Sequence, residues 1–238
     1  MKKVVVIFNG GTISMKVDER IKAAVPTLNG EEIMSMVTGI ESHAEVESYN
    51  FSSLPSPHVT PELMLELSNY IKGFLKREDV DGVVVTHGTD TLEETAYFLH
   101  LTIKSDKPIV ITGSMRNSSE LGYDGPANLA ASICTATSNQ ARGRGVLVCL
   151  NDEINAAIEV TKSHSMKLNT FESPEFGLVG IVDNNEAHVY RESLDHDYIG
   201  TDKIETDVEL IKACAGMDGK YIDFCVERGV KGLVVEGT

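Results

Sequence analysis

Four short runs rich in valine and isoleucine, at residues 3–8, 82–86, 108–112 and 146–150, constrain most what this chain can fold into. None of them alternates between apolar and polar residues, as a strand with one wet face would. Such runs are typical of strands buried on both faces of a parallel sheet. They therefore predict a parallel sheet that is covered by helices on both sides.

Helical segments separate these runs. Thr60 followed by Pro61 and Glu62 is typical of a helix start, with a cap, a first-turn proline and an acidic first turn. Two more helices are expected at about residues 91–104 and 126–138. The alternation of strands and helices predicts an α/β fold, a doubly wound and mostly parallel sheet.

The pattern changes after about residue 175. A hairpin is expected from residues 177–182 and 187–190, then a polar, acidic stretch, then one strand–helix–strand unit at 208–213, 220–228 and 231–236. We therefore predict an N-terminal domain at 1–190, a linker at 191–205, and the start of a smaller α/β C-terminal domain at 206–238. One such unit buries little apolar surface, so we expect the second domain to be incomplete at Thr238.

Composition narrows the possible partners and location. A formal net charge of −15 repels phosphate backbones and anionic lipids, which argues against nucleic acid and membrane partners. The first apolar run is too short for a signal peptide, so a cytoplasmic protein is expected. The cysteines lack metal-site or CxxC spacing and are expected to be buried core residues: Cys134, Cys149, Cys214 and Cys225.

Two of the predicted strands end in glycine turns that carry threonine. The first is followed by Asn9-Gly10-Gly11-Thr12-Ile13 and the second by His87-Gly88-Thr89-Asp90-Thr91. In an open parallel sheet, ligands bind beyond the carboxyl ends of the strands, so Thr12, Thr89 and Asp90 are expected near one crevice. The glycine spacing matches neither a dinucleotide fingerprint nor a P-loop, and no cluster has metal-ligand spacing. No cofactor and no metal are therefore expected.

Each of these residues also has a structural interpretation. Asp90 is a possible helix cap, with Glu93 completing a capping box. Thr89 is a possible turn-stabilising residue, and Thr12 a possible loop hydroxyl. Lys162, on spacing alone, is typical of a surface lysine.

Three segments resemble the signature segments of bacterial-type L-asparaginases, and they occur in the order that this family has. They are residues 9–13, 87–95 and 161–164. Residues 111–116 and 171–174 are also similar to that family. The stretch from His87 to Thr95 is the most specific of these matches.

The resemblance implies an amidohydrolase that converts L-asparagine to L-aspartate and ammonia, with weak activity on glutamine. It implies that Thr12 is the nucleophile and that Thr89, Asp90 and Lys162 form a second hydroxyl-based catalytic set. By the same resemblance, Asp90 also binds the α-ammonium of the substrate and Ser56 its α-carboxylate. A small-molecule substrate is thus the expected partner, and the full-length form is expected to be a homodimer or homotetramer.

The chemistry suits these residues. An unassisted threonine hydroxyl is a poor nucleophile and needs a base or an adjacent positive charge, which Lys162 is expected to supply near Thr89. Backbone N–H groups in the glycine turns are natural donors to an oxyanion.

The chain also departs from the family pattern. Residues 16–27 contain no tyrosine, although many family members carry one on the loop after the nucleophile. Pro57 follows Ser56 where the family often has glutamine, and the family's C-terminal domain continues beyond this chain, with residues that reach the substrate of a neighbouring subunit. Two alternatives therefore stay open: an asparaginase-like subunit of a tRNA-dependent amidotransferase, and a degenerate amino-acid-binding or regulatory homologue.

Overall fold

The computed structural model describes residues 1–193 and 197–237, in two compact units, Met1–Gly200 and Thr201–Thr238. The predicted linker at 191–205 includes residues 194–196, and the predicted incomplete end falls on residue 238. Both positions lie outside the described residues. The predicted domain bounds stay a prediction.

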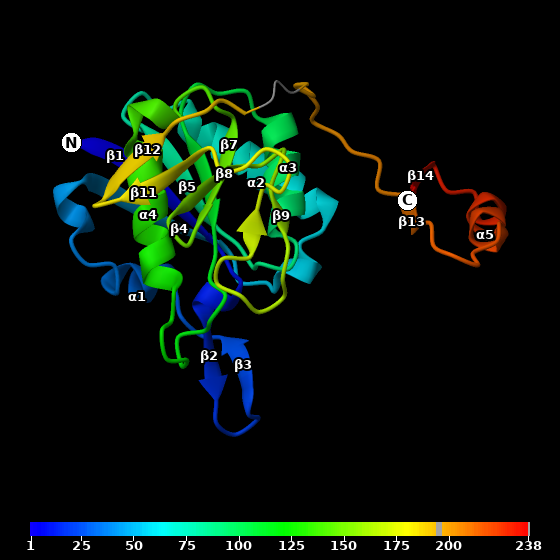
Figure 1. Cartoon of the computed structure of the whole chain (residues 1–238), viewed down its shortest axis with the longest axis horizontal. Helices are drawn as coiled ribbons and strands as arrows, with labels where there is room; N and C mark the ends of the chain where they lie inside the picture. Colours follow the sequence, from blue (N-terminus) through cyan, green and yellow to red (C-terminus); the bar gives the residue numbers. More distant parts are fainter. Residues whose placement is uncertain (194–196, 238) are drawn as a thin grey trace. The chain divides into compact units, whose positions relative to one another are not determined.

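The first unit is built on one eight-stranded sheet (Figure 1). Its strand order is β4-β1-β5-β6-β7-β8-β11-β12. The first five of these strands are parallel, and the last three continue the sheet in antiparallel pairs. The parallel strands are β4 (Ala44–Ser52), β1 (Lys2–Asn9), β5 (Gly82–Thr86), β6 (Ile109–Thr112) and β7 (Val146–Leu150), and the others are β8 (Glu153–Ala156), β11 (Gly180–Asp183) and β12 (Glu186–Val189). The predicted α/β fold class, with a mostly parallel sheet, is confirmed.

Helices cover both faces of this sheet. The side chains of β1 alternate between two buried clusters, with Val4 and Val6 in one and Val5 and Ile7 in the other. The first cluster includes residues of α1 (Gly30–Ser35) and α4 (Gly125–Thr137), and the second includes residues of α2 (Pro61–Leu75) and α3 (Leu92–Thr102). Both faces of the central strands are therefore buried, which explains why their sequences do not alternate between apolar and polar residues.

The start of α2 shows how local sequence sets an element. Thr60 is the N-cap, and its side chain accepts a hydrogen bond from the backbone N–H of Leu63. Pro61 occupies the first helical turn, where a missing N–H costs nothing. The cap and proline lie where the sequence predicts them.

Other elements differ from the prediction. Strands β4 and β8 were not expected, nor was the hairpin of β2 (Met15–Asp18) and β3 (Ala23–Pro26), which projects from the first unit (Figure 1). Two short strands, β9 (Thr161–Lys162) and β10 (Phe171–Glu172), pair separately from the large sheet. The prediction for Cys214 was wrong, because it lies in the turn after β13 and is exposed, whereas Cys134, Cys149 and Cys225 are buried.

The strand order has one reversal that matters for function. The chain passes from β1 to β4 on one side of β1, and then returns to β5 on its other side. In open α/β sheets, ligand crevices lie at the carboxyl ends of the strands at such a switch point. The turns that follow β1 and β5 are the two that carry Thr12 and Thr89.

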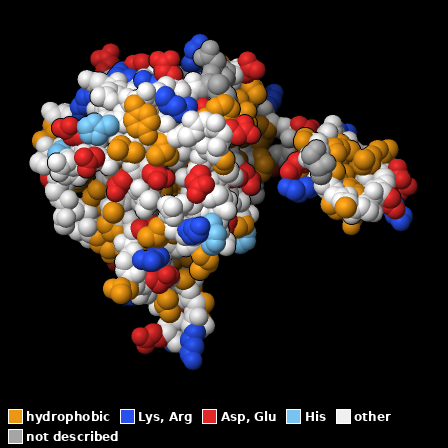
Figure 2. All heavy atoms as spheres, viewed as in Figure 1, with side chains coloured by type: hydrophobic (Ala, Val, Ile, Leu, Met, Phe, Trp, Pro, Cys, Tyr) orange, Lys and Arg blue, Asp and Glu red, His pale blue; other side chains and the backbone are white. Residues whose placement is uncertain are grey.

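The second unit is small. Strands β13 (Val208–Lys212) and β14 (Gly232–Glu236) are parallel, and α5 (Lys220–Arg228) connects them. Of its described residues only Cys225 is buried. Figure 2 shows apolar side chains on the surface of this unit. Its exposed large apolar residues include Leu210, Tyr221, Phe224 and Val226.

Within residues 1–193 and 197–237, no helix combines the length and the apolar character needed to cross a membrane.

Candidate active site

The turn after β1 packs directly against its neighbours. Gly10 and Gly11 have φ angles of +79° and +86°, in the region that favours glycine. A Cβ atom on Gly11 would lie 2.4 Å from the backbone nitrogen of Gly88, and one on Gly10 would lie 2.5 Å from the carbonyl oxygen of Leu54. The two glycines therefore let the turn that carries Thr12 touch the turns after β5 and β4.

A buried histidine shapes the turn after β5. His87 is fully buried, and burial lowers its pKa below the usual value, so the ring is neutral at neutral pH. Its Nδ1 lies 2.8 Å from the carbonyl oxygen of Gly88, and its Nε2 lies 2.9 Å from Oγ1 of Thr95. A carbonyl only accepts, so Nδ1 carries the proton and Nε2 accepts from Thr95. The ring thus fixes the peptide that leads into Thr89.

Lys162 lies at the centre of the polar cluster. Its Nζ donates to Oγ1 of Thr89 at 3.1 Å and to Oδ1 of Asp90 at 2.7 Å. The lysine side chain is only 13% exposed, whereas that of Asp90 is 68% exposed. Lys162 is therefore not a surface lysine, and the Asp90 carboxylate is open to solvent on one side and paired with an ammonium on the other.

The backbone of Lys162 is held as well. Its N–H donates to Oε2 of Glu93, in the first turn of α3, at 2.5 Å, and the residue pairs with Phe171 of the neighbouring strand β10. The alternative in which Asp90 and Glu93 form a capping box was wrong. The N-cap of α3 is Thr91, it has no side-chain cap bond, and both carboxylates bind Lys162 instead.

Ser56 lies beside the same turn. It is buried, and its Oγ accepts from the backbone N–H of Thr91 at 3.4 Å, while its carbonyl accepts from Thr91 Oγ1 at 2.8 Å. A Cβ on Gly88 would lie 2.8 Å from the Ser56 side chain. Direct hydrogen bonds thus join Thr89, Asp90 and Lys162. Ser56 adjoins that set through its hydrogen bonds to Thr91 and through its side chain, which packs on Gly88. The Thr12 turn adjoins it where Gly11 packs on Gly88.

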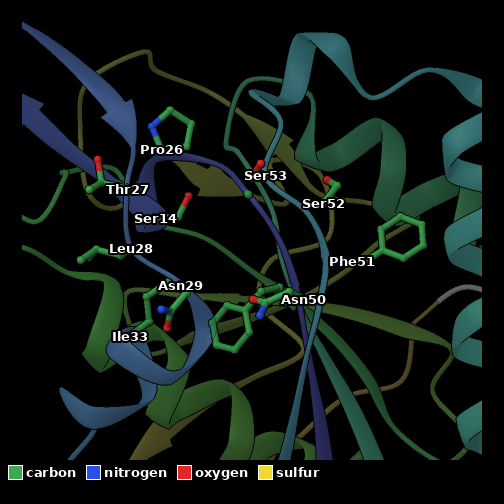
Figure 3. A pocket seen from close by; sticks show the side chains of 12 residues that line it. Ser14, Pro26, Thr27, Leu28, Asn29, Ile33, Asn50, Phe51, Ser52 and Ser53 are labelled. Carbon is green, nitrogen blue, oxygen red and sulfur yellow. The ribbon is translucent and has the colours of Figure 1, made fainter.

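Figure 3 shows a pocket that is lined in part by sequence neighbours of Thr12. It has a volume of about 390 Å³, and Gly10 and Ser14 are among its lining residues. Its lining is apolar with uncharged polar side chains, and it contains none of the predicted site residues. The groups that can transfer protons lie outside this pocket, so we place the candidate active site at the Lys162 cluster.

The sequence did not predict the roles of two residues in this cluster. His87 was part of the quoted motif but had no assigned role, and Glu93 was considered only as a cap. The available signal was that His87 directly follows a buried strand and that Glu93 lies in the first turn of the helix after it. Among the described residues, no group of three or more histidine, cysteine, aspartate or glutamate side chains is placed to hold a metal ion.

Fold and site together define a class of protein. It is an α/β protein with a hydroxyl, a lysine and a carboxylate in contact at the carboxyl edge of a parallel sheet. Comparison with known proteins agrees with this class. The family model described as "Asparaginase, N-terminal" matches residues 3–195.

Individual relatives extend the match. The chain is 38% identical to an L-asparaginase of Bacillus licheniformis, over all of this chain and 73% of that protein. It is also 38% identical to L-asparaginase 2 of Bacillus subtilis (strain 168), over 98% of this chain and 64% of that protein. A crystal structure of a probable cytoplasmic L-asparaginase from Campylobacter jejuni matches with a TM-score of 0.89 and 31% identity, over 99% of this chain and 74% of the other.

The chain belongs to the asparaginase family, and its class of enzyme is that of the amidohydrolases. The predicted family and enzyme class are confirmed.

Proposed function

We propose that this chain hydrolyses L-asparagine to L-aspartate and ammonia, with Thr12 as the nucleophile. The observation that carries the proposal is the contact of Lys162 Nζ with Thr89 Oγ1 and Asp90 Oδ1. A lysine and a carboxylate beside a hydroxyl at the switch point form one of the arrangements that can activate a hydroxyl for amide hydrolysis without a metal.

The first half-reaction forms an ester. The Thr12 oxygen attacks the side-chain amide carbon of the substrate, and the carbonyl oxygen becomes an oxyanion. Backbone N–H groups of the glycine turns stabilise that charge. The C–N bond then breaks, the nitrogen takes up the proton that the Thr12 hydroxyl has given up and leaves as ammonia, and a β-aspartyl ester of Thr12 remains.

The second half-reaction releases aspartate. Thr89, held by Lys162, takes part in activating the water that attacks the ester, and the Thr12 hydroxyl is restored. The positive charge of Lys162 lowers the proton affinity of the Thr89 hydroxyl, and Asp90 keeps that charge in place.

The same groups recognise the substrate. The Asp90 carboxylate, which is largely exposed, is proposed to bind the α-ammonium. The Ser56 hydroxyl accepts from Thr91 N–H, which leaves its own hydrogen for the α-carboxylate. This arrangement selects an amino acid over a simple amide.

The test is ammonia release by the wild-type chain with L-asparagine, L-glutamine and D-asparagine. We expect the highest kcat/KM with L-asparagine, a lower one with L-glutamine, and one aspartate formed for each ammonia. If L-asparagine binds and no ammonia appears, the chain is an amino-acid-binding homologue. Co-purification with tRNA or a second subunit would support the amidotransferase alternative.

The same proposal includes location and assembly. The Campylobacter jejuni relative is called a probable cytoplasmic L-asparaginase. We propose a cytoplasmic location for this chain, which cell fractionation tests. We also propose a homo-oligomer, because an exposed apolar surface such as that of α5 usually marks an interaction site. Light scattering coupled to size exclusion should give a mass of at least two chains.

A further inference from the structure

The turn that carries Thr12 is held from outside by a second segment, residues 114–124, which we call the bracing loop. The hydroxyl of Tyr123 donates to the carbonyl oxygen of Ile13 at 2.6 Å. The N–H and the Oγ of Ser118 both donate to the carbonyl oxygen of Met15, at 3.0 and 2.9 Å. The bracing loop therefore binds the backbone on the C-terminal side of Thr12 at two successive points.

The bracing loop is itself fixed by one carboxylate. Asp124 accepts from Ser114 Oγ at 2.8 Å and from the backbone N–H groups of Met115 and Arg116 at 3.0 and 2.9 Å. It also accepts from Nδ2 of Asn128 in α4, at 2.9 Å. The side chain of Asp124 therefore ties the end of the loop to its beginning and to α4. Tyr123, the residue before Asp124, extends from a loop that is held in one conformation.

The Thr12 turn has little freedom left once Tyr123 is in place. Both the backbone N–H and the Oγ of Ser14 donate to the carbonyl oxygen of Gly11, at 3.0 and 2.8 Å, which closes the turn around Thr12. Gly11 itself packs on Gly88. The carbonyl oxygen of Thr12 accepts from the backbone N–H of Met15. The bond from Tyr123 holds the following peptide plane, between Ile13 and Ser14. The turn is therefore held on both sides of Thr12.

Tyr123 is suited to be a permanent donor. Burial, and to a lesser degree the charge of Asp124, raise the pKa of its phenol well above the usual value, so it stays protonated. The ring also fills the space over Gly125, where a Cβ would lie 2.5 Å from it. Neither contact requires a substrate, so the brace exists before binding.

We propose that Tyr123 is a positioning residue for Thr12: its hydroxyl fixes the Ile13 carbonyl and thereby the attack geometry of the threonine oxygen. This inference rests on the proposed function of Thr12. Small errors in the placement of a nucleophile are costly, because attack requires the reacting atoms at near-contact distance with aligned orbitals. Residues 16–27, on the other side of the turn, contain no tyrosine that supplies the same bond.

The test is Tyr123→Phe, which keeps the ring and removes only the hydroxyl. We expect kcat for L-asparagine to fall by about tenfold, the change that corresponds to loss of roughly one hydrogen bond in the transition state. KM should change by less than about twofold, because Tyr123 contacts no predicted substrate-binding group.

The matched control is Tyr49→Phe. Tyr49 on β4 also donates through its hydroxyl, to Glu47 Oε2 at 3.1 Å. That carboxylate also binds Lys3 and Arg77, which are not part of the Thr12 turn. Tyr49→Phe should lower Tm by about as much as Tyr123→Phe does, and it should keep the wild-type kcat. Ser118→Ala is the second variant, which weakens the same brace without touching the core and should lower kcat by a smaller factor.

The outcomes separate the two proposals. If Tyr123→Phe and Ser118→Ala have the same kcat as the control Tyr49→Phe, or if they raise KM alone, Tyr123 is not a positioning residue. The proposed amidohydrolase activity is then unaffected. If the wild-type chain itself releases no ammonia, the proposed function is wrong.

Discussion

At the scale of single residues, the site depends on a lysine that the sequence does not distinguish. Lys162 is 73 residues from Thr89 and 69 from Glu93 along the chain. Only tertiary structure brings them together, so neither spacing nor periodicity predicts the contact. The resemblance to a family did identify it, whereas Tyr123 had no such signal.

The charges of this cluster make a first prediction. Lys162→Met should lower kcat by at least about a thousandfold while L-aspartate still binds, because the methionine keeps the volume and removes the charge. Asp90→Asn should also raise KM, because the α-ammonium loses its counter-charge. Steady-state ammonia release and calorimetric binding of L-aspartate measure both effects.

The control for this prediction is Lys167→Met, an exposed lysine in the same segment. It should behave as wild type. Retention of more than about a tenth of wild-type kcat by Lys162→Met would remove the lysine from the mechanism.

His87 predicts how stability depends on pH. Its pKa is lowered by burial in the folded chain and is ordinary when unfolded. Below about pH 6.5 the unfolded chain therefore binds more protons, and the free energy of unfolding falls as the pH drops toward the folded pKa. One proton limits this slope to about 1.4 kcal/mol per pH unit.

Denaturant unfolding between about pH 5.5 and 7.5 tests this expectation. His87→Asn keeps a donor near the Nδ1 position and cannot titrate, so its slope should be smaller than that of wild type. His43→Asn, at an exposed histidine, should leave the slope unchanged. Equal slopes for His87→Asn and wild type would show that His87 is not the titrating group.

At the scale of elements, burial decided what could be predicted. Strands β5 and β7 are buried along their whole length, and their apolar runs predicted them. Strand β4 is an edge strand that, among the described residues, pairs with β1 alone. Apart from the buried Ala44 its residues are exposed or half-buried, so it has no apolar run. The turns after β1 and β5 were predictable as a site because the strands were, whereas the placement of Ser56 after β4 depended on the family resemblance.

The contact between α3 and β9 makes a prediction of its own. Glu93→Ala removes the acceptor for the Lys162 N–H. The backbone of Lys162 is then no longer held against α3, and kcat should fall by about tenfold. Glu93→Gln keeps an oxygen acceptor and should recover most of the activity. Glu94→Ala, at the exposed neighbouring position, is the control and should match wild type. A Glu93→Ala variant with wild-type kcat would show that this bond does not position Lys162.

At the scale of the whole molecule, the two units differ in what holds them together. The first has two buried clusters on either side of a large sheet, while the second has one buried residue among those described. The fold class of the first was predictable from its apolar runs. For the second, the sequence predicted the strand–helix–strand order but not how exposed its apolar side chains are, because exposure depends on what packs against them.

Hydrogen exchange should therefore separate the units. Amides of β5, β6 and β7 should exchange only through global unfolding. Those of β13 and β14 should exchange through local opening, which has a much lower free energy. If self-association covers α5, protection in the second unit should increase with protein concentration. Equal protection of β13 and β5 in dilute solution would contradict the difference.

The central claim is that Thr12 and Thr89 carry the hydrolysis of L-asparagine, and ammonia release by Thr12→Ala and Thr89→Val tests it most directly. Thr12 lies in a turn, and valine matches the shape of the buried Thr89, so both variants should keep the fold by circular dichroism. We expect each variant to lower kcat by at least about a thousandfold. A folded variant at either position that keeps more than about a tenth of wild-type kcat would contradict it.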